Sequence, residues 1–257
     1  MASKVRAGPY RATTLFETAL YSLFGAALSV WVSSRAPAQP TNESCDGERL
    51  ANLPLVARPP RADSGSTLVV LLTGDGGWAA ADEKVAAALL DRGAAVLGVN
   101  MRAYLARPKT PDQAAADIGC VARAYLDKWR RTRLMLLGYS RGADIAPFVV
   151  ARWPDDLKQK LNLVALVSMS THANFHFRLV DLVRDVKRPD DLPVVPELAR
   201  LVGIRVVCIY GSEEKDSGCR AADPALVTKY ERKGGHRLTG GFAEVASILE
   251  QGLKPLP

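Results

Sequence analysis

Runs of apolar residues alternate with amphipathic segments over most of this chain, and the alternation predicts its secondary structure. Continuous apolar stretches are typical of strands buried on both faces of a sheet. Stretches of strand length lie at 66–74, 94–100, 133–138, 161–169, 204–211 and 225–231. Segments with helical spacing lie at 80–93, 110–129, 141–153 and 242–253. Thr110 followed by Pro111 is a recognised signal for a helix start.

Strands that alternate with helices predict an α/β fold, with a mostly parallel central sheet covered by helices on both faces. We expect residues 66–257 to form this domain. The segment 39–65 is rich in proline and charge, and we interpret it as a leading segment with one short strand near 53–56. Between 170 and 201 the alternation breaks down, which favours a small cap over the carboxyl edge of the sheet.

The first 38 residues have the features of an export signal. Lys4, Arg6 and Arg11 precede an apolar core at 18–32, and small residues suited to cleavage follow at 36–38. The core is shorter than the roughly 20 residues that span a bilayer, which favours a cleaved signal peptide over an uncleaved anchor. In either case we expect the globular part to lie outside the cytoplasm.

The four cysteines fit this exported context. They are Cys45, Cys120, Cys208 and Cys219, and they allow three disulfide connectivities. Cys208 and Cys219 flank one loop and are the preferred pair. Because no C-x-x-C spacing occurs, neither a structural zinc site nor a thioredoxin-type redox site is indicated.

The formal net charge of +7 favours anionic membranes or substrates only mildly. No basic stripe is interleaved with aromatic residues, so the sequence does not indicate a nucleic-acid partner.

The segment Gly138-Tyr139-Ser140-Arg141-Gly142 fits the pattern G-x-S-x-G. It lies between a predicted strand and a predicted helix, which is the context of the nucleophile elbow in the α/β-hydrolase fold. A serine on such a turn stands clear of the sheet, and the helix N-terminus beneath it supplies backbone N–H groups. The pattern therefore predicts Ser140 as a nucleophile.

A nucleophilic serine needs a base, and His236 is the histidine placed to provide it. In hydrolases of this kind the histidine follows the acid and precedes the last helix, and the sequence around His236 meets that order. His172 and His176 are four residues apart and would share one face of a helix. Because no third ligand accompanies them, the sequence predicts no metal site, and it indicates no cofactor.

The acid is expected in the loop that follows the strand ending at Gly211. This loop contains Glu213, Glu214 and Asp216. Spacing alone slightly favours Glu214, which lies three residues beyond the glycine. A carboxylate here would accept the N–H at Nδ1 of the histidine and stabilise the imidazolium.

The glycine-rich stretch 72–78 is the candidate oxyanion loop. The N–H of Asp75 or Gly76, together with that of Arg141, would bind the oxyanion. A nucleotide-binding loop is the competing interpretation, but neither a Walker lysine nor a complete G-x-G-x-x-G is present. Asp144 lies in the first turn of the helix after Ser140, where the helix dipole favours a carboxylate. The alternative role for Asp144 is to bind a cationic substrate group.

These blocks resemble the VirJ/AcvB family of exported bacterial α/β-hydrolases. The resemblance rests on G-D-G-G-W, on G-Y-S-R-G-A-D, on C-I-Y-G-S-E-E-K-D-S-G-C and on G-G-H-R-L-T-G-G-F, in the family's order. It implies a periplasmic serine hydrolase that cleaves the aminoacyl ester of lysyl-phosphatidylglycerol, with Ser140 as nucleophile and His236 as base. The Asp-Ser-x-Cys pattern is similar to the family's and implies Asp216, in preference to Glu214, as the acid.

The resemblance also bears on partners. It implies an anionic membrane lipid as substrate, reached by peripheral contact or through an N-terminal anchor, and a link of some members to secretion-system proteins. Arg141 departs from the family pattern, and we expect its side chain to face a phosphate headgroup. Two other functions stay open at this point: a non-catalytic assembly factor associated with type IV secretion, and a broad carboxylesterase.

Overall fold

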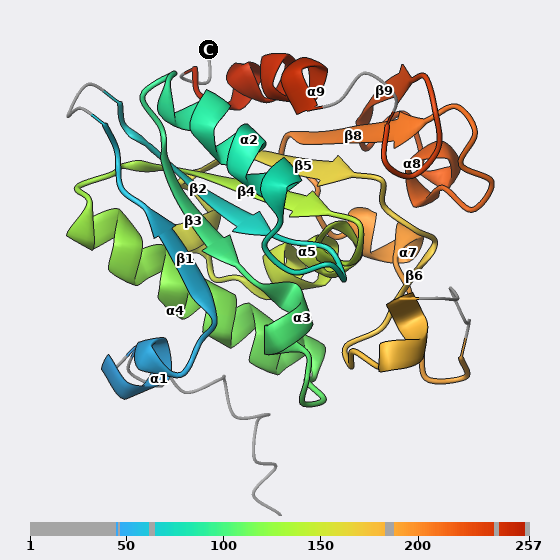
Figure 1. Ribbon diagram of the computed structural model, residues 1–257, viewed down its shortest axis with the longest axis horizontal. Helices are drawn as coiled ribbons and strands as arrows, with labels where there is room; N and C mark the ends of the chain where they lie inside the picture. Colours follow the sequence, from blue (N-terminus) through green and yellow to red (C-terminus); the bar gives the residue numbers. More distant parts are fainter. Residues whose placement is uncertain (1–44, 46, 62–64, 183–187, 239–241, 255–257) are drawn as a thin grey trace, which may run out of the picture. The chain divides into compact units, whose positions relative to one another are not determined.

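Seven strands form the central sheet of the computed structural model, in the order β1-β3-β2-β4-β5-β8-β9 (Figure 1). β1 pairs antiparallel with β3, and the pairings from β3 to β9 are parallel. The strands are β1 (Leu55–Arg58), β2 (Thr67–Leu72), β3 (Ala95–Val99), β4 (Arg133–Tyr139), β5 (Leu161–Val167), β8 (Val206–Gly211) and β9 (Thr228–Arg232). The predicted mostly parallel α/β sheet is confirmed.

The structure describes residues 45, 47–61, 65–182, 188–238 and 242–254, all within one compact unit, Ser44–Pro257. Its helices are α1 (Gly47–Ala51), α2 (Ala80–Leu90), α3 (Met101–Tyr104), α4 (Pro111–Lys128), α5 (Arg141–Arg152), α6 (Asp155–Lys158), α7 (Val195–Leu198), α8 (Gly218–Ala221) and α9 (Phe242–Leu249). Two short 3₁₀ turns, η1 (Leu179–Leu182) and η2 (Glu250–Gly252), complete the set within these residues.

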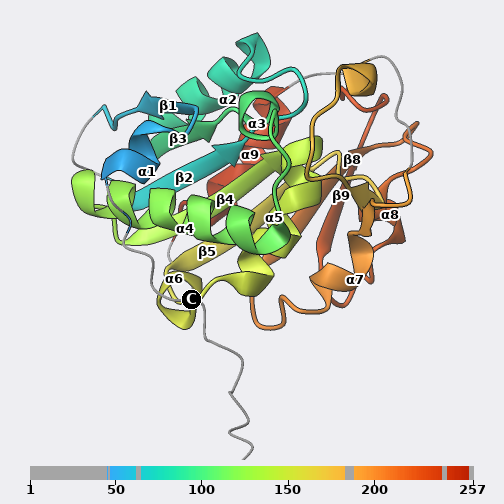
Figure 2. The same cartoon turned by 90° about the horizontal axis from the view of Figure 1, so that it is seen from below.

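The helices cover both faces of the sheet, with α2 and α9 on one side and α4 and α5 on the other (Figures 1 and 2). β2 illustrates why, because all six of its residues are buried. Leu68, Val70 and Leu72 pack with the α4 and α5 layer, whereas Val69 and Leu71 pack with the α2 and α9 layer. The alternation follows from the two-residue period of a strand.

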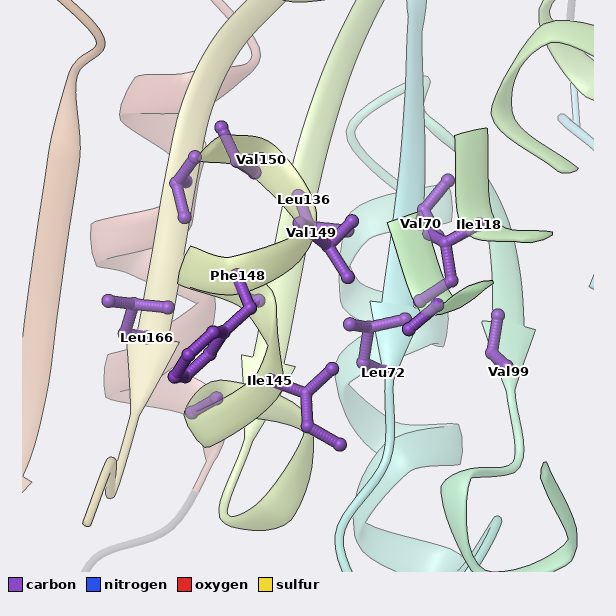
Figure 3. Packing of buried hydrophobic residues seen from close by; sticks show 14 of the residues in the cluster. Val70, Leu72, Val99, Ile118, Leu136, Ile145, Phe148, Val149, Val150 and Leu166 are labelled. Carbon is purple, nitrogen blue, oxygen red and sulfur yellow. The ribbon is translucent and has the colours of Figure 1, made fainter. Parts of the chain in front are cut away.

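Figure 3 shows the α5 side of this core, where Ile145 of α5 lies beside Leu72 of β2 and Phe148 lies beside Leu166 of β5. Full burial of one such side chain stabilises the fold by about 1.5–3 kcal/mol. Because α5 begins directly after β4, this packing also fixes where the first turn of α5 lies relative to the strand ends.

The predicted start of the long helix is confirmed. Thr110 is the N-cap of α4, and its hydroxyl accepts a 3.1 Å hydrogen bond from the N–H of Gln113. The side chain of Gln113 in turn accepts a 2.9 Å bond from the N–H of Thr110. This reciprocal capping box pairs the N–H groups of Thr110 and Gln113, and Pro111 at the first helical position has no N–H to pair.

Part of the leading segment joins the domain. β1 forms the edge strand beside β3, and a disulfide joins Cys45 to Cys120 of α4. The second disulfide is Cys208–Cys219, as the sequence predicted. Disulfides persist in oxidising compartments, so the two bridges indicate a protein that is exported to such a compartment.

The described residues of the segment 170–201, which are 170–182 and 188–201, form a small cap, as expected from the broken alternation. It contains the two-stranded sheet of β6 (His172–Ala173) and β7 (Leu192–Pro193), together with η1 and α7. The predicted signal or anchor, residues 1–38, lies outside the described residues. None of the described helices has both the length and the hydropathy that a membrane span requires.

Candidate active site

Ser140 lies on a sharp turn between β4 and α5. Its backbone adopts φ 53° and ψ −121°, a conformation that side-chain-bearing residues rarely adopt. A Cβ atom on Gly142 would lie 2.1 Å from the carbonyl oxygen of Leu72, and one on Gly138 would lie 2.5 Å from the carbonyl oxygen of Gly142. Both glycines are therefore required for α5 to start this close to the strand ends, which is the geometry of a nucleophile elbow.

His236 reaches Ser140 from the loop after β9. Its Nε2 lies 2.7 Å from Oγ of Ser140. The carbonyl of His236 accepts a 2.9 Å hydrogen bond from the hydroxyl of Ser168, which holds the loop in place. The loop passes directly over the end of β8, where a Cβ on Gly211 would lie 2.3 Å from the carbonyl oxygen of Gly234.

Glu214 is the carboxylate beside the imidazole. Its Oε1 lies 3.1 Å from Nδ1 of His236, and the side chain is only 7% exposed. The N–H of Gly211 donates to the other carboxylate oxygen at 3.3 Å, within a turn closed by the bond from Glu214 N to Gly211 O. The contact with Nδ1 has ion-pair length but not the alignment of a hydrogen bond, and such contacts often become aligned only when substrate binds.

The expected pairing of Asp216 with His236 is corrected by this geometry. Asp216 accepts a 2.8 Å hydrogen bond from the hydroxyl of Thr171, at the start of the cap. The turn at 211–214 brings Glu214 back toward β8, whereas Asp216 lies beyond that turn and faces the cap. The spacing of three residues beyond Gly211 indicated the carboxylate that lies beside His236, whereas the family pattern indicated one that contacts the cap.

The loop between β2 and α2 lies against Ser140, as an oxyanion loop would. A Cβ on Gly74 would lie 3.2 Å from Cβ of Ser140. The N–H of Met101 donates a 3.0 Å bond to the hydroxyl of Thr73, which anchors the start of the loop. Gly76 faces open space. The roles of the N–H groups of Asp75, Gly76 and Arg141 as oxyanion donors stay predictions.

A cavity of about 560 Å³ opens beside Ser140 and His236, and acidic residues dominate its wall. The carboxylic residues that line it are Asp75, Asp144, Asp181, Asp191, Glu213, Glu214 and Asp216. The lysine and arginine residues that line it are Arg141, Arg188 and Lys215. This excess of carboxylates favours a cationic ligand.

Arg141, expected to face a phosphate headgroup, lines the cavity with its guanidinium already engaged by protein acceptors. Its Nε and Nη2 donate to the two carboxylate oxygens of Asp75 at 2.5 and 3.0 Å. Nη1 donates to the carbonyl of Asn174 at 3.1 Å, and Nη2 also donates to Asp181 at 3.2 Å. A phosphate headgroup would have to compete with two carboxylates for this side chain, and the carboxylate of Asp75 is equally engaged.

Asp144 lines the cavity one turn of α5 beyond Ser140. Its Oδ1 accepts a 2.7 Å hydrogen bond from the N–H of Ser170. Burial raises the pKa of the Asp144 carboxyl to about 8, although the Ser170 N–H and the charge of Arg141 oppose that rise. A buried carboxyl with this pKa at the wall of a cleft marks a functional candidate.

His172 and His176 do not share a helix face. His172 lies in β6, where Nδ1 is 2.8 Å from the hydroxyl of Thr171, and it lines the cavity. The described part of the chain contains no group of three or more His, Cys, Asp or Glu side chains placed to hold a metal ion.

Comparison with known proteins assigns the chain to a family. The family model described as "Bacterial virulence protein (VirJ)" matches residues 66–255. The chain belongs to the VirJ family. A comparison with curated protein sequences finds no match.

Solved structures resemble this VirJ family member in fold. Est1E from Butyrivibrio proteoclasticus superimposes with a TM-score of 0.55 at 12% identity, covering 77% of this chain and 91% of its own. Esterase Pf2001 from Pyrococcus furiosus superimposes with a TM-score of 0.55 at 13% identity, covering 81% of this chain and 92% of its own. TT1662 from Thermus thermophilus superimposes with a TM-score of 0.55 at 18% identity, covering 80% of this chain and 96% of its own. The VirJ family member therefore has the α/β-hydrolase fold.

Sequence reasoning missed the contribution of the cap to this site. Asn174, Asp181, Arg188 and Asp191 all line the cavity, and Asp181 forms ion pairs with both Arg141 and Arg188. The charged composition of 170–201 and its position after β5 were the signals available. They indicated a cap but not which of its side chains would meet α5.

We expect Glu214→Gln to lower kcat for a small neutral ester by about 10²–10⁴-fold, because a glutamine cannot stabilise the imidazolium at His236. Asp216→Asn is the matched control and should stay within about threefold of the unchanged protein. Steady-state kinetics on p-nitrophenyl acetate compare the two. A large loss in Asp216→Asn with none in Glu214→Gln would restore Asp216 as the acid.

We also expect Asp144→Asn to stabilise the protein increasingly as pH rises. An unfolded aspartate titrates near pH 3.9, so between about pH 4 and 8 the folded protein retains a proton that the unfolded chain has lost. Stability from this group therefore falls as pH rises through that window, and asparagine removes the loss. Urea unfolding at pH 5 and pH 8 should show a larger gain at pH 8. An equal gain at both values would contradict the raised pKa.

Proposed function

We propose that this protein is a serine hydrolase that cleaves the aminoacyl ester of lysyl-phosphatidylglycerol. The observation that carries the proposal is the array of Ser140, His236 and Glu214, with Oγ 2.7 Å from Nε2 and Nδ1 3.1 Å from the carboxylate. In this order the imidazole can take the proton of the hydroxyl and so activate it for acyl transfer, while the carboxylate stabilises the imidazolium.

The reaction follows from the roles of these groups. Nε2 of His236 takes the proton of Ser140 as Oγ attacks the carbonyl carbon of the lysyl ester. Backbone N–H groups of Arg141 and of the loop at 74–76 bind the resulting oxyanion. The glycerol oxygen leaves with the proton from His236, and phosphatidylglycerol departs. Water, deprotonated by His236, then attacks the lysyl–Ser140 ester; the bond to Oγ breaks, Oγ takes the proton back from His236, and lysine is released.

The acidic wall of the cavity supports a lysyl group as the acyl part. Among the described residues, Asp144, Glu213 and Asp216 line the cavity and form no ion pair with lysine or arginine. A lysyl ester carries two amino groups, and carboxylates that lack a cationic partner are the groups that bind ammonium ions most favourably. An ammonium beside Asp144 would stabilise its ionised form, so substrate binding would release a proton.

Export of the protein supports access to such a lipid. The two disulfides indicate an oxidising compartment. Together with the predicted export signal at 1–38, they favour the periplasm, where the domain would meet the membrane surface peripherally or through residues 18–32. Membership of the VirJ family agrees with the resemblance on which the lipid assignment rests.

We expect the purified protein to release lysine from vesicles of lysyl-phosphatidylglycerol, and Ser140→Ala to lose this activity by at least about 10³-fold, because the nucleophile is removed. Lysine release is measured by chromatography, with vesicles of phosphatidylglycerol as the blank.

Two outcomes would contradict the assignment. If Ser140→Ala restores every phenotype of a deletion strain, the protein acts as a non-catalytic assembly factor. If a short acyl ester is turned over orders of magnitude faster than the lipid, the protein is a broad carboxylesterase.

We expect Asp144→Asn to raise KM for the lysyl lipid by about tenfold, the size of a lost charge-assisted contact, with p-nitrophenyl acetate turnover within about threefold. Asp82→Asn is the matched control, because Asp82 is also a buried carboxyl whose pKa is raised by burial and whose side chain accepts a backbone N–H, that of Ala79. Asp82 lies outside the cavity beside Ser140. Equal effects of the two substitutions on KM would refute ammonium binding by Asp144.

A further inference from the structure

One guanidinium joins three separate parts of the chain at the active site. Arg141 is the residue after Ser140, and its side chain is 10% exposed. Asp75, which binds it through both carboxylate oxygens, belongs to the loop after β2. Asp181 and the carbonyl of Asn174 belong to the cap. The nucleophile helix, the candidate oxyanion loop and the cap therefore meet on a single side chain.

Two of these parts, the start of α5 and the loop after β2, carry the two halves of the candidate oxyanion hole. One donor is the backbone N–H of Arg141, at the start of α5. The other is a backbone N–H near Asp75, in a loop that lies so close to the nucleophile that a Cβ on Gly74 would be 3.2 Å from Cβ of Ser140. An oxyanion hole works only when its donors are held 2.7–3.1 Å from the developing oxyanion. The side chains of Arg141 and Asp75 are placed to hold that spacing.

We propose that Arg141 is a positioning residue, whose two-pronged ion pair with Asp75 locks the 74–76 loop onto the first turn of α5 and so fixes the oxyanion hole. The inference rests on the proposed function, in which Ser140 is the nucleophile. In this role the side chain of Arg141 touches neither the substrate nor the reacting atoms. The ion pair of Arg141 with Asp181 attaches the cap to the same side chain.

The chemistry of arginine suits this role better than that of lysine. A planar guanidinium matches both oxygens of a carboxylate and still has donors for other acceptors, whereas an ammonium acts as a point charge. Four donor–acceptor pairs are formed here, two with Asp75 and one each with Asn174 and Asp181. Because separating Arg141 from Asp75 or Asp181 would leave a poorly solvated charge without its partner, these three side chains are held in one geometry.

The ion pair also accounts for the acidic residue in the glycine-rich loop. Glycines at 74, 76 and 77 leave this loop few side chains with which to fix its own position, and Gly77 adopts a positive φ of 70°. Gly76 has no atom within 4 Å of the position of a Cβ. Within residues 74–77, Asp75 is the residue whose side chain can bind other parts of the protein and so fix the position of the loop.

The test uses Arg141→Met, Asp75→Asn and the double variant in the full chain. Arg152→Met is the matched control, because Arg152 lies on the same helix and pairs with Asp112 at 2.9 Å and Glu197 at 3.2 Å, away from the cavity. Arg141→Lys, which keeps the charge but loses the two-pronged geometry, serves if Arg141→Met does not fold. Two properties are measured: amide hydrogen exchange of peptides covering 73–78, and kcat and KM for p-nitrophenyl acetate.

We expect both single variants to exchange the amides of the 73–78 loop at least about tenfold faster than the unchanged protein. We expect kcat to fall by about 10²-fold, comparable to the loss of one oxyanion donor, with KM within about threefold. Because the two residues act through one contact, the double variant should be no more than about threefold worse than the poorer single variant. Arg152→Met should change neither exchange of this loop nor kcat.

Unchanged exchange and unchanged kcat in Arg141→Met and Asp75→Asn would overturn the proposal. A rise in KM for the lysyl lipid alone, with ester kcat intact, would also overturn it and assign Arg141 to the headgroup. If the unchanged protein hydrolyses no ester, the proposed function fails separately. The exchange measurement then decides by itself whether Arg141 and Asp75 fix the loop.

Discussion

The close approach of the first turn of α5 to the ends of β2 and β4 is the constraint on which the active site depends. It leaves no room for a Cβ atom at Gly138 or Gly142 and forces Ser140 into a positive φ of 53°. Packing of Ile145 and Phe148 against the sheet stabilises the helix in this place. The strain at one residue is therefore maintained by a large buried surface, which is how folded proteins retain unfavourable backbone conformations at functional sites.

The charges of the site divide into those that are neutralised and those that are not. Asp75 and Asp181 are neutralised by Arg141 together with Arg188, which also pairs with Asp181. Asp144 is buried with only a backbone N–H and more distant charges to offset its desolvation, and its pKa rises accordingly. Such a group lowers the stability of the folded protein at neutral pH. The proposed lysyl ammonium would favour the ionised form of this carboxyl and so give its position on the cavity wall a function.

Features fixed by neighbouring residues were predictable from the sequence. The strand–serine–helix turn at Ser140, the cap of α4 at Thr110 and the Cys208–Cys219 bridge all depend on short segments. Features that depend on contacts between loops far apart in the sequence were not predictable from it. Arg141 is 66 residues from Asp75 and 40 from Asp181, and no periodicity or motif links the three. The expectation that its side chain faces a headgroup considered the serine's neighbour without these carboxylates, which engage the guanidinium.

The choice between Glu214 and Asp216 shows why a pattern of residue types does not by itself assign a role. In the Asp-Ser-x-Cys stretch, Asp216 holds the cap, Ser217 caps α8 through the N–H of Arg220, and Cys219 forms a disulfide. Each member has a structural purpose, so the pattern can persist without any contact to the imidazole. The acid is decided instead by the turn after β8, which directs the longer side chain of Glu214 under His236. The backbone path, rather than the residue pattern, determines which carboxylate lies beside the imidazole.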